Sequence, residues 1–317
     1  MSLFSEGRLF PGQDPFVVPF ENSLLLIQTR ANDRQISVLR FPSLARMHEN
    51  TESVIWTPPR GSDHAREIWA PELHNIDRLW YVYYAASDGE NERHRTYVLE
   101  ADHPLGPYHE LGKVYDPLHD TFSIDLTVLR HDRKLYAVWS GWDGPNDGFP
   151  QNLYIAPMAN PWTISEERTL ISRPEHDWEL SVAAINEGPE VLRNPHDGKL
   201  FIAYSADASW TSAYKMGLLE FVGGDVTDPS SWQKLSRPLF TGGGHGCFVE
   251  VDGVLYAVYH RKLTNEPGWS DRVIRYDPVG WDSAGYPFIA RRVSETESAA
   301  AAPASFPGAA VEGSSSS

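Results

Sequence analysis

The chain has 317 residues, of which 41% are hydrophobic, so it is long enough to bury a substantial core. Its 43 acidic and 27 basic residues give a net charge of −16, which disfavours nucleic acids and anionic membranes as partners. The single cysteine, Cys247, excludes an intrachain disulfide. No stretch has the pattern of a signal peptide or a transmembrane span, which predicts a cytoplasmic protein, or a secreted one if a leader has been removed.

Short apolar stretches rich in Val, Ile, Tyr and Trp alternate with Gly, Asp, Asn and Pro turns, a pattern that indicates strands rather than helices. In chain order, five segments repeat it: DPFVVPFENSLLLIQ (14–28), WAPELHNIDRLWYVYY (69–84), DLTVLRHDRKLYAVW (125–139), EGPEVLRNPHDGKLFIAY (187–204) and HGCFVEVDGVLYAVYH (245–260). Their first residues are 55, 56, 62 and 58 positions apart, a spacing that suits four-stranded blades. The sequence therefore predicts an all-β protein folded as a five-bladed β-propeller.

The register of these repeats aligns five residues that are far apart in the chain: Asp14, Trp69, Asp125, Glu187 and His245. In four copies the first residue lies ten positions before a leucine that opens the second strand, and in the fourth copy the gap is thirteen. The longer gap predicts a longer hairpin turn at 194–198. Equivalent positions at the start of the inner strands converge on a propeller axis, so the five residues are expected to form one ring.

The last predicted strands end near residue 289. Beyond them, the stretch from 294 to 317 is rich in Ala, Ser, Pro and Gly and has few large apolar side chains. We therefore expect a single catalytic propeller domain over 1–293 and a disordered tail over 294–317.

The ring contains three carboxyl groups and no lysine or arginine. Carboxyl groups without matched cations raise one another's pKa, which allows one to stay protonated while another is ionised. Glycoside hydrolysis uses such a pair, and a separation of about 6.5–9.5 Å leaves room for a water molecule and predicts inversion at the anomeric carbon. The residues therefore favour a hydrolase that cleaves a neutral oligosaccharide or polysaccharide.

Two other interpretations of the ring stay open at this point. Asp14, Asp125, Glu187 and His245 could ligate a divalent metal ion that acts as the catalyst. Alternatively, the propeller could bind sugar without cleaving it, in which case the aromatic residues would matter most and the carboxylates would only accept hydrogen bonds. Cys247 is expected to be an inert, buried thiol, and the glycine run at 242–244 to allow a close approach of the backbone to the axis.

The repeat segments together resemble glycoside hydrolase family 43 over roughly residues 10–290. The resemblance is carried by DPFVV, EIWAPELHNIDRLWYVYYAA, SIDLTVL with KLYAVWSGW, NEGPEVL with GKLFIAYSADASW, and GHGCFVE with LYAVYH. It implies a five-bladed propeller and an inverting hydrolase that acts on arabinofuranosides, arabinans or xylosides. It implies no required cofactor.

The resemblance also implies roles for the ring residues. Asp14 would be the general base that activates water, Glu187 the general acid, and Asp125 the residue that orients the acid and tunes its pKa. Glu190 competes for the role of acid, but strand alternation is expected to place it on the opposite face from Glu187. His245 would lie on the axis under the pocket, where it would contact water or a bound calcium or sodium ion.

Further residues are candidates for contact with the substrate. The resemblance implies that Trp69 forms a wall of the sugar pocket, and Phe16, Trp142 and Trp210 are candidate aromatic contacts, with ordinary packing as the alternative for each. Arg272 could bind a sugar hydroxyl or could be a surface cation.

The motifs WAPELH, EGPEVL and SADASW are most similar to the arabinofuranosidase branch, which releases arabinose from chain ends. Within WAPELH, Glu72 and His74 are expected to be framework residues. A β-xylosidase and an endo-acting arabinanase of the same family remain alternatives. The sequence indicates no oligomeric state.

Overall fold

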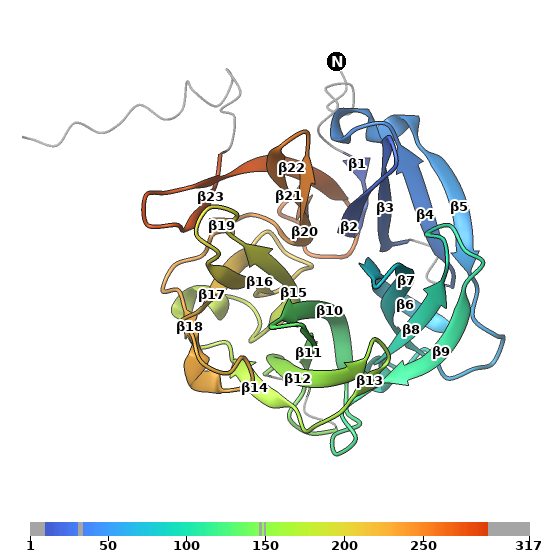
Figure 1. Cartoon of the computed structure of the whole chain (residues 1–317), viewed down its shortest axis with the longest axis horizontal. Coiled ribbons are helices and arrows are strands. Elements are labelled where there is room, and N and C mark those ends of the chain that lie inside the picture. The colour runs from blue at the N-terminus through green and yellow to red at the C-terminus, as the bar shows by residue number, and fades with distance from the viewer. Residues whose placement is uncertain (1–9, 31–33, 146–147, 149, 291–317) are drawn as a thin grey trace, which may run out of the picture.

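The computed structural model describes residues 10–30, 34–145, 148 and 150–290, which form five antiparallel sheets arranged around a common axis (Figure 1). The predicted all-β, five-bladed β-propeller is therefore confirmed. The tail expected over 294–317 lies outside the described residues. None of the helices in the described part is long and apolar enough to cross a bilayer.

In the first three blades the strands follow one another from the axis to the rim, except that in blade 3 both β13 and β14 pair with β12. Blade 1 contains β2 (Gln13–Phe20), β3 (Ser23–Thr29), β4 (Ile36–Phe41) and β5 (Thr51–Trp56). Blade 2 contains β6 (Arg66–Ile76), β7 (Leu79–Ser87), β8 (Arg95–Ala101) and β9 (His109–Val114). Blade 3 contains β10 (Ser123–His131), β11 (Lys134–Gly141), β12 (Asn152–Asn160), β13 (Thr163–Ile164) and β14 (Thr169–Ser172).

The last two blades repeat this order with short additional strands. Blade 4 contains β15 (Asn186–Arg193), β16 (Leu200–Ala206), β17 (Lys215–Phe221), β18 (Trp232–Lys234) and β19 (Phe240–Thr241). Blade 5 contains β20 (Gly244–Val251), β21 (Val254–Lys262), β22 (Arg272–Trp281) and β23 (Pro287–Ile289). Short 3₁₀ helices lie in the connections: η2 (Leu44–Glu49), η3 (Asn91–Arg93), η4 (Asp177–Glu179) and η5 (Pro229–Ser231).

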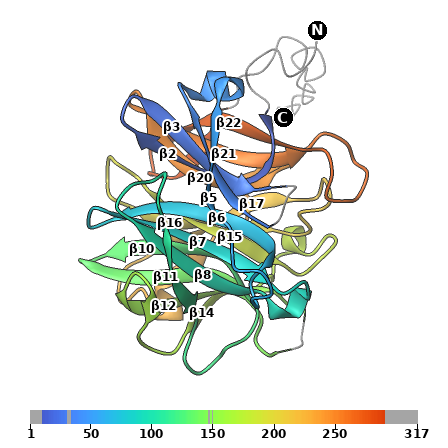
Figure 2. The ribbon, with the colours of Figure 1, turned by 90° about the vertical axis from the view of Figure 1, so that its right-hand side faces the viewer.

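The ring of blades is closed by a strand from the beginning of the chain. The two-residue strand β1 (Phe10–Pro11) pairs with β22 of the last blade, Phe10 opposite Ile274. The inner strands β2, β6, β10, β15 and β20 contact one another in sequence, and β20 contacts β2. Figure 2 accordingly shows β2 and β3 beside β21 and β22, so the first and last blades are neighbours.

The hydrophobic core lies mainly between neighbouring blades. One cluster joins blades 1 and 2, and others join blades 2 and 3, 3 and 4, and 4 and 5. Leu26 of β3 and Val82 of β7 are both fully buried in the first of these clusters. Burial of each such side chain contributes about 1.5–3 kcal/mol, so the packing between blades holds the axial ends of the inner strands in place.

The turns between first and second strands follow the sequence pattern. In blades 2 and 3 both central turn residues have positive φ, for example Asp77 and Arg78, as a two-residue hairpin of the right twist requires. In blade 4 the predicted longer turn is confirmed, because β15 ends at Arg193 and β16 begins at Leu200. Within it, the Asn194 N–H donates to the Lys199 carbonyl at 2.8 Å.

Candidate active site

The axial start of every inner strand contains an irregularity in its pairing with the next strand. Each blade has a residue of positive φ, between 41° and 57°, within such an irregularity: Asp14, Ala70, Asp125, Gly188 and His245. Blade 2 has a second irregularity, in which Glu67 also has positive φ, at 49°. This backbone conformation is costly for residues that carry a side chain. The fold therefore concentrates backbone strain at the position where the predicted ring lies.

The register of the ring differs by one residue from the sequence prediction in two blades. Trp69 and Glu187 lie one position before the positive-φ residue, whereas Asp14 occupies it. In blade 2 the leucine marker was misaligned: Leu79 is the first residue of β7 and pairs with Ile76, while the corresponding leucine in blade 1 is the second residue of β3. In blade 4 the longer turn hides the same offset.

Asp14 is surrounded by basic side chains. Its Oδ1 lies 3.2 Å from Nδ1 of His260, 3.4 Å from Nδ1 of His245 and 4.0 Å from the Arg272 guanidinium. Its backbone N–H also donates to Nδ1 of His260 at 3.1 Å. Burial by itself would raise the pKa of the Asp14 carboxyl, but these neighbours, His245 foremost, hold that pKa well below its usual range. Asp14 is therefore an ionised carboxylate.

Glu187 has the opposite environment. The Tyr214 hydroxyl donates to its Oε1 at 2.8 Å, and the Gln151 amide donates to its Oε2 at 3.1 Å. Neither donor carries a positive charge. Burial, reinforced by the nearby Asp125, raises the pKa of the Glu187 carboxyl to about 7. A proton is therefore retained on Glu187 under conditions in which Asp14 has lost its own.

Asp125 contacts residues next to both of these carboxyl groups: Gly188, which follows Glu187, and His245, which lies beside Asp14. Its Oδ2 accepts a hydrogen bond from the Gly188 N–H at 3.0 Å and lies 4.0 Å from Nδ1 of His245. Burial raises the pKa of Asp125, against the lowering effect of His245. Because Gly188 directly follows Glu187, Asp125 is tied to the backbone that carries the predicted acid.

His245 connects two other predicted ring residues at the axis, because its Nδ1 is close to both Asp14 and Asp125. Gly188 packs against its ring: a Cβ at position 188 would lie 2.9 Å from two ring carbons. Across the described ranges, no group of three or more His, Cys, Asp or Glu residues is arranged to hold a metal ion. The described side chains thus do not fit an axial ion held by several protein ligands, and an ion with His245 as its sole protein ligand stays a prediction.

The structure corrects the expected direction of Glu190. Glu187 pairs with Ser205 and Glu190 with Ala203, so three residues of β15 span two residues of β16. The extra residue cancels the normal alternation, and both glutamates project from the same face of β15. Strand alternation was therefore the wrong reason to prefer Glu187 over Glu190 as the acid. The two glutamates differ instead in the residues that surround them.

Glu190 belongs to a second buried group around Glu72 and Thr127, and its Oε2 has no hydrogen-bond partner. Burial raises the pKa of both glutamates well above the usual range, and the Thr127 hydroxyl counteracts this for each. Nε2 of His74 lies 2.7 Å from Oε2 of Glu72. Glu72 and His74 thus contact each other, in keeping with their expected framework role, and Glu190 lacks the Tyr214 and Gln151 contacts of Glu187.

Two predicted aromatic residues lie on the side of blades 2 and 3. Trp69 is partly exposed and stacks on His94 with ring centroids 3.7 Å apart. Trp142 is buried and stacks on Phe122 at 4.2 Å. Trp69 packs against the cluster that contains Phe122 and Trp142, so the aromatic rings form one continuous wall.

Trp210 and Arg272 lie on the side of blades 4 and 5. The ring of Trp210 is 5.3 Å from that of Trp269, which is 61% exposed, and the Arg272 guanidinium lies 5.2 Å above Trp269. Arg272 is thus a largely buried neighbour of Asp14 rather than a free surface cation. Phe16, by contrast, packs in the core of blades 1 and 2 and contacts the ring of His74 at 4.9 Å, a position that favours packing over contact with a substrate.

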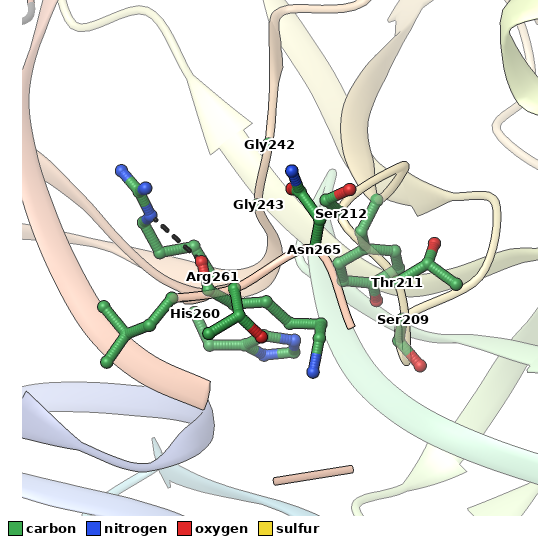
Figure 3. A pocket seen from close by; sticks show the side chains of 12 residues that line it. Ser209, Thr211, Ser212, Gly242, Gly243, His260, Arg261 and Asn265 are labelled. Carbon is green, nitrogen blue, oxygen red and sulfur yellow. Dashed lines mark hydrogen bonds between the residues drawn. The ribbon is translucent and has the colours of Figure 1, made fainter. Parts of the chain in front are cut away.

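A cavity of about 190 Å³ lies between the loops of blades 4 and 5. Figure 3 shows it between Ser209, Thr211 and Ser212 of one loop and Asn265 and the adjoining strand of the other. The rings of Tyr214 and His260 also line it, and these are the residues that contact Glu187 and Asp14. The cavity is therefore a polar recess that adjoins the ring.

The sequence analysis did not identify Tyr214, Gln151 or His260. Tyr214 and Gln151 directly precede β17 and β12, in segments that the repeat does not cover. His260 was within reach, because it ends the quoted segment LYAVYH, opposite Gly244 in the pairing of β20 with β21. A histidine that faces the glycine run at 242–244 could have been recognised as a neighbour of the ring.

A propeller whose axis gathers two buried carboxyl groups with oppositely shifted pKa values has the acid and base pair that glycoside hydrolysis uses, which points to that class of enzyme. The chain belongs to glycosyl hydrolases family 43, whose model matches residues 10–287.

Named relatives and solved structures agree with this family. The extracellular exo-alpha-(1->5)-L-arabinofuranosidase of Streptomyces chartreusis is 36% identical over 74% of this chain and 75% of its own length. Alpha-L-arabinofuranosidase 43 of Humicola insolens is 33% identical over 80% of this chain, which spans only 56% of that relative. The crystal structure of alpha-L-arabinofuranosidase from Lactobacillus brevis superposes with a TM-score of 0.81 at 32% identity, covering 89% of this chain and 94% of that one.

Proposed function

We propose that the protein is an inverting exo-α-L-arabinofuranosidase, which releases L-arabinofuranose from the ends of arabinan or arabino-oligosaccharides. The observation that carries the mechanism is the opposite environment of two buried carboxyl groups. Asp14 lies beside His245 and Arg272, which hold its pKa low, whereas Glu187 accepts hydrogen bonds from uncharged donors and its pKa is raised to about 7. The names of the similar arabinofuranosidases support the substrate.

In the proposed reaction, water attacks the anomeric carbon while Asp14 accepts one of its protons. At the same time Glu187 donates its proton to the glycosidic oxygen, and the bond between that oxygen and the anomeric carbon breaks. Asp125 holds the backbone of the acid through the Gly188 N–H. The products are a sugar of inverted configuration and a chain shortened by one unit, after which Asp14 loses a proton to solvent and Glu187 gains one.

We further propose that the sugar to be released lies against the aromatic wall of Trp69, and that the polar recess beside Tyr214 accommodates a neighbouring sugar. An aromatic face suits the apolar side of a sugar ring, and the Ser, Thr and Asn side chains of the recess suit its hydroxyls. A neutral ligand also suits a chain with a net charge of −16.

The compartment is a separate part of the proposal. The names of two Streptomyces relatives include the word extracellular, whereas no relative supports the cytoplasmic location expected from the sequence. We propose that the native protein acts outside the cell. Fractionation of the native host, with activity and immunodetection in medium and cell extract, tests this.

Product analysis tests the catalytic proposal. Purified protein is incubated with α-1,5-arabino-oligosaccharides and, in parallel, with xylo-oligosaccharides, while the anomeric protons are followed by NMR. We expect free arabinose to appear first as the β-anomer. Xylose as the main product would show that the substrate is a xyloside and leave the proposed mechanism unchanged. Arabinose released first as the α-anomer would refute inversion. Binding without any product would refute catalysis.

A further inference from the structure

The carboxyl group of Glu187 is held by a tyrosine that no sequence motif singles out. The Tyr214 hydroxyl donates to Oε1 of Glu187 at 2.8 Å, while the Gln151 amide donates to Oε2. Tyr214 enters the site from the connection between β16 and β17, and Gln151 from the residue before β12. Both oxygens of the acid are therefore held by donors from outside its own strand.

The position of Tyr214 is itself tightly determined. Its side chain is almost completely buried, and its ring stacks on the ring of His260 with centroids 5.4 Å apart and planes 17° apart. On another side it contacts Gly244, where a Cβ atom would lie only 2.7 Å from a carbon of the tyrosine ring. The glycine at 244 thus provides the space in which Tyr214 lies.

These contacts connect the two halves of the reaction. His260 contacts both the backbone N–H and the carboxylate of Asp14. Tyr214, which stacks on the His260 ring, contacts Glu187. Tyr214 and His260 also line the cavity between blades 4 and 5. Figure 3 shows His260 at this cavity. A single stacked pair therefore sets the position of the acid relative to the base.

The hydroxyl of Tyr214 also affects the acid chemically. A donor to a carboxyl oxygen favours the ionised form, so it stabilises the carboxylate that appears once the proton has passed to the leaving oxygen. The charged or titratable groups that face Glu187 are Asp125 from β10, His245 from β20 and Asp14 from β2, besides Tyr214 itself. Of these, only Tyr214 is shown donating a hydrogen bond to the carboxyl group.

We propose that Tyr214 is the positioning residue of the acid: its hydroxyl orients Glu187 and stabilises the carboxylate left after proton transfer, and its stacking on His260 keeps the acid in register with Asp14. This inference rests on the proposed hydrolase function. It predicts that the phenol oxygen matters most for substrates whose leaving group needs full protonation.

The substitution Tyr214→Phe removes only that oxygen and retains the ring that fills the space beside Gly244. On arabinobiose, whose leaving group is a poor one, we expect kcat/KM to fall about tenfold or more, with the alkaline limb of the pH profile displaced upward by about one pH unit or more. On a 4-nitrophenyl arabinofuranoside, whose leaving group needs little protonation, we expect a much smaller loss. Gln151→Met, which removes the second donor, should act in the same direction.

A purely structural role for Tyr214 would give equal losses on both substrates and an unmoved pH profile, and that result would overturn the proposal. Tyr108→Phe is the matched control, because it also removes a buried hydroxyl, one that donates to the Pro104 carbonyl in blade 2. This control should leave the ratio of the two substrates and the alkaline limb unchanged.

A second readout does not depend on turnover. The Glu187 carboxyl can be titrated by NMR in protein labelled with ¹³C at the glutamate side-chain carboxyl, and its signal assigned by comparison with Glu187→Gln. We expect Tyr214→Phe to raise the titration midpoint. An unchanged midpoint would refute the inference even if the protein is a hydrolase, whereas a parent protein that cleaves neither substrate would refute the proposed function and leave the titration to decide on Tyr214.

Discussion

Two buried carboxyl groups of the same site differ in charge because their neighbours differ. Asp14 is close to His245, whose pKa is raised despite its burial by the surrounding carboxyl groups, and to the Arg272 guanidinium, so its negative charge is compensated. His260 is a further neighbour, but burial lowers its own pKa to about 4, so it is neutral near pH 7. Glu187 accepts hydrogen bonds only from neutral donors, and burial together with the nearby Asp125 opposes the loss of its proton more strongly than His245 favours it. The division of labour between base and acid therefore arises from the side chains around the two groups rather than from their depth in the protein.

Neutral replacements of the two carboxyl groups test these roles. Asp14→Asn and Glu187→Gln preserve size and should leave the fold intact, but neither side chain can transfer a proton in the proposed reaction. We expect each to lower kcat on arabino-oligosaccharides by about 10²–10⁴-fold or more. Circular dichroism and the melting temperature serve as controls for folding. Near-normal turnover by both variants would contradict the assignment.

The pH dependence of kcat/KM follows from the same two groups. Glu187 must be protonated to act, and its pKa is raised to about 7, so activity should fall as pH rises through about 7. Asp14 must be ionised, and its pKa lies well below the usual range, so no loss is expected near pH 4, where an ordinary aspartate would gain its proton. Initial rates at low substrate concentration across the pH range measure both limbs. A drop near pH 4 that persists in His260→Asn would show that Asp14 titrates normally, because burial lowers the pKa of His260 itself to about 4.

At the residue scale, the sequence predicted which of these residues lie together better than it predicted what surrounds them. Asp14, Asp125 and His245 were expected to lie together, and in the structure a carboxylate oxygen of each aspartate lies within 4.0 Å of Nδ1 of His245. Tyr214 and Gln151 could not be predicted, because their positions depend on connections that differ from blade to blade. The face of Glu190 was mistaken, because strand alternation does not apply across an extra residue.

At the scale of elements, the irregular start of each inner strand explains why these side chains reach the axis. The hydrogen-bond ladder admits an additional residue there, and that residue adopts positive φ in all five blades. The repeat predicted the hairpins and the longer turn of blade 4, because turn residues and strand lengths are local properties. It did not predict the offset of Trp69 and Glu187, because the leucine used to align the repeats is the first residue of the second strand in blades 2 and 4 but the second residue in blade 1.

Gly188 tests the importance of this irregularity. It has a φ of 52°, and a Cβ atom would lie 2.9 Å from the His245 ring. We expect Gly188→Ala to destabilise the protein by about 1–3 kcal/mol, because it adds the cost of the backbone conformation to displacement of His245, and to lower kcat strongly. Chemical denaturation and initial rates measure the two effects.

Gly198→Ala is the matched control for this variant. Gly198 also has positive φ, at 79°, but a Cβ atom there would meet nothing within 4 Å. Gly198→Ala should therefore lower the free energy of unfolding only through the backbone conformation and leave kcat unchanged. Equal effects of the two alanines on kcat would mean that contact with His245 is irrelevant to the site.

At the scale of the whole molecule, the propeller was predictable because its unit is repeated five times. Each repeat is too small to bury its own faces, so the blades pack on one another and the ring must close. How the ring closes was not predictable. Phe10 and Pro11 lie before the first repeat, and a two-residue segment has too little sequence pattern to predict that it pairs with the last blade.

Closure should contribute measurably to stability. Deleting residues 1–12 removes β1 and leaves its pairing edge on β22 without a partner, whereas deleting residues 1–9 retains β1. We expect the longer deletion to melt at least a few degrees below the shorter one, since each kcal/mol shifts the melting temperature by about 2–4 °C in a domain of this size or slightly smaller. Differential scanning calorimetry of the two proteins measures the contribution of β1 together with Gly12, whose N–H donates to the Arg272 carbonyl at 3.2 Å. Equal melting temperatures would mean that this closing segment contributes nothing.

The same closure imposes a delay during synthesis. The ribosome completes β22 about 270 residues after β1, which at roughly 5–20 residues per second leaves the first strand waiting for its partner for about 15–50 s. Throughout that interval blade 5 is incomplete and its future neighbour in blade 1 is uncovered. A circular permutant that begins between β5 and β6 would translate β1 after β22, and the nascent chain could then finish the last blade as soon as the joined termini had emerged.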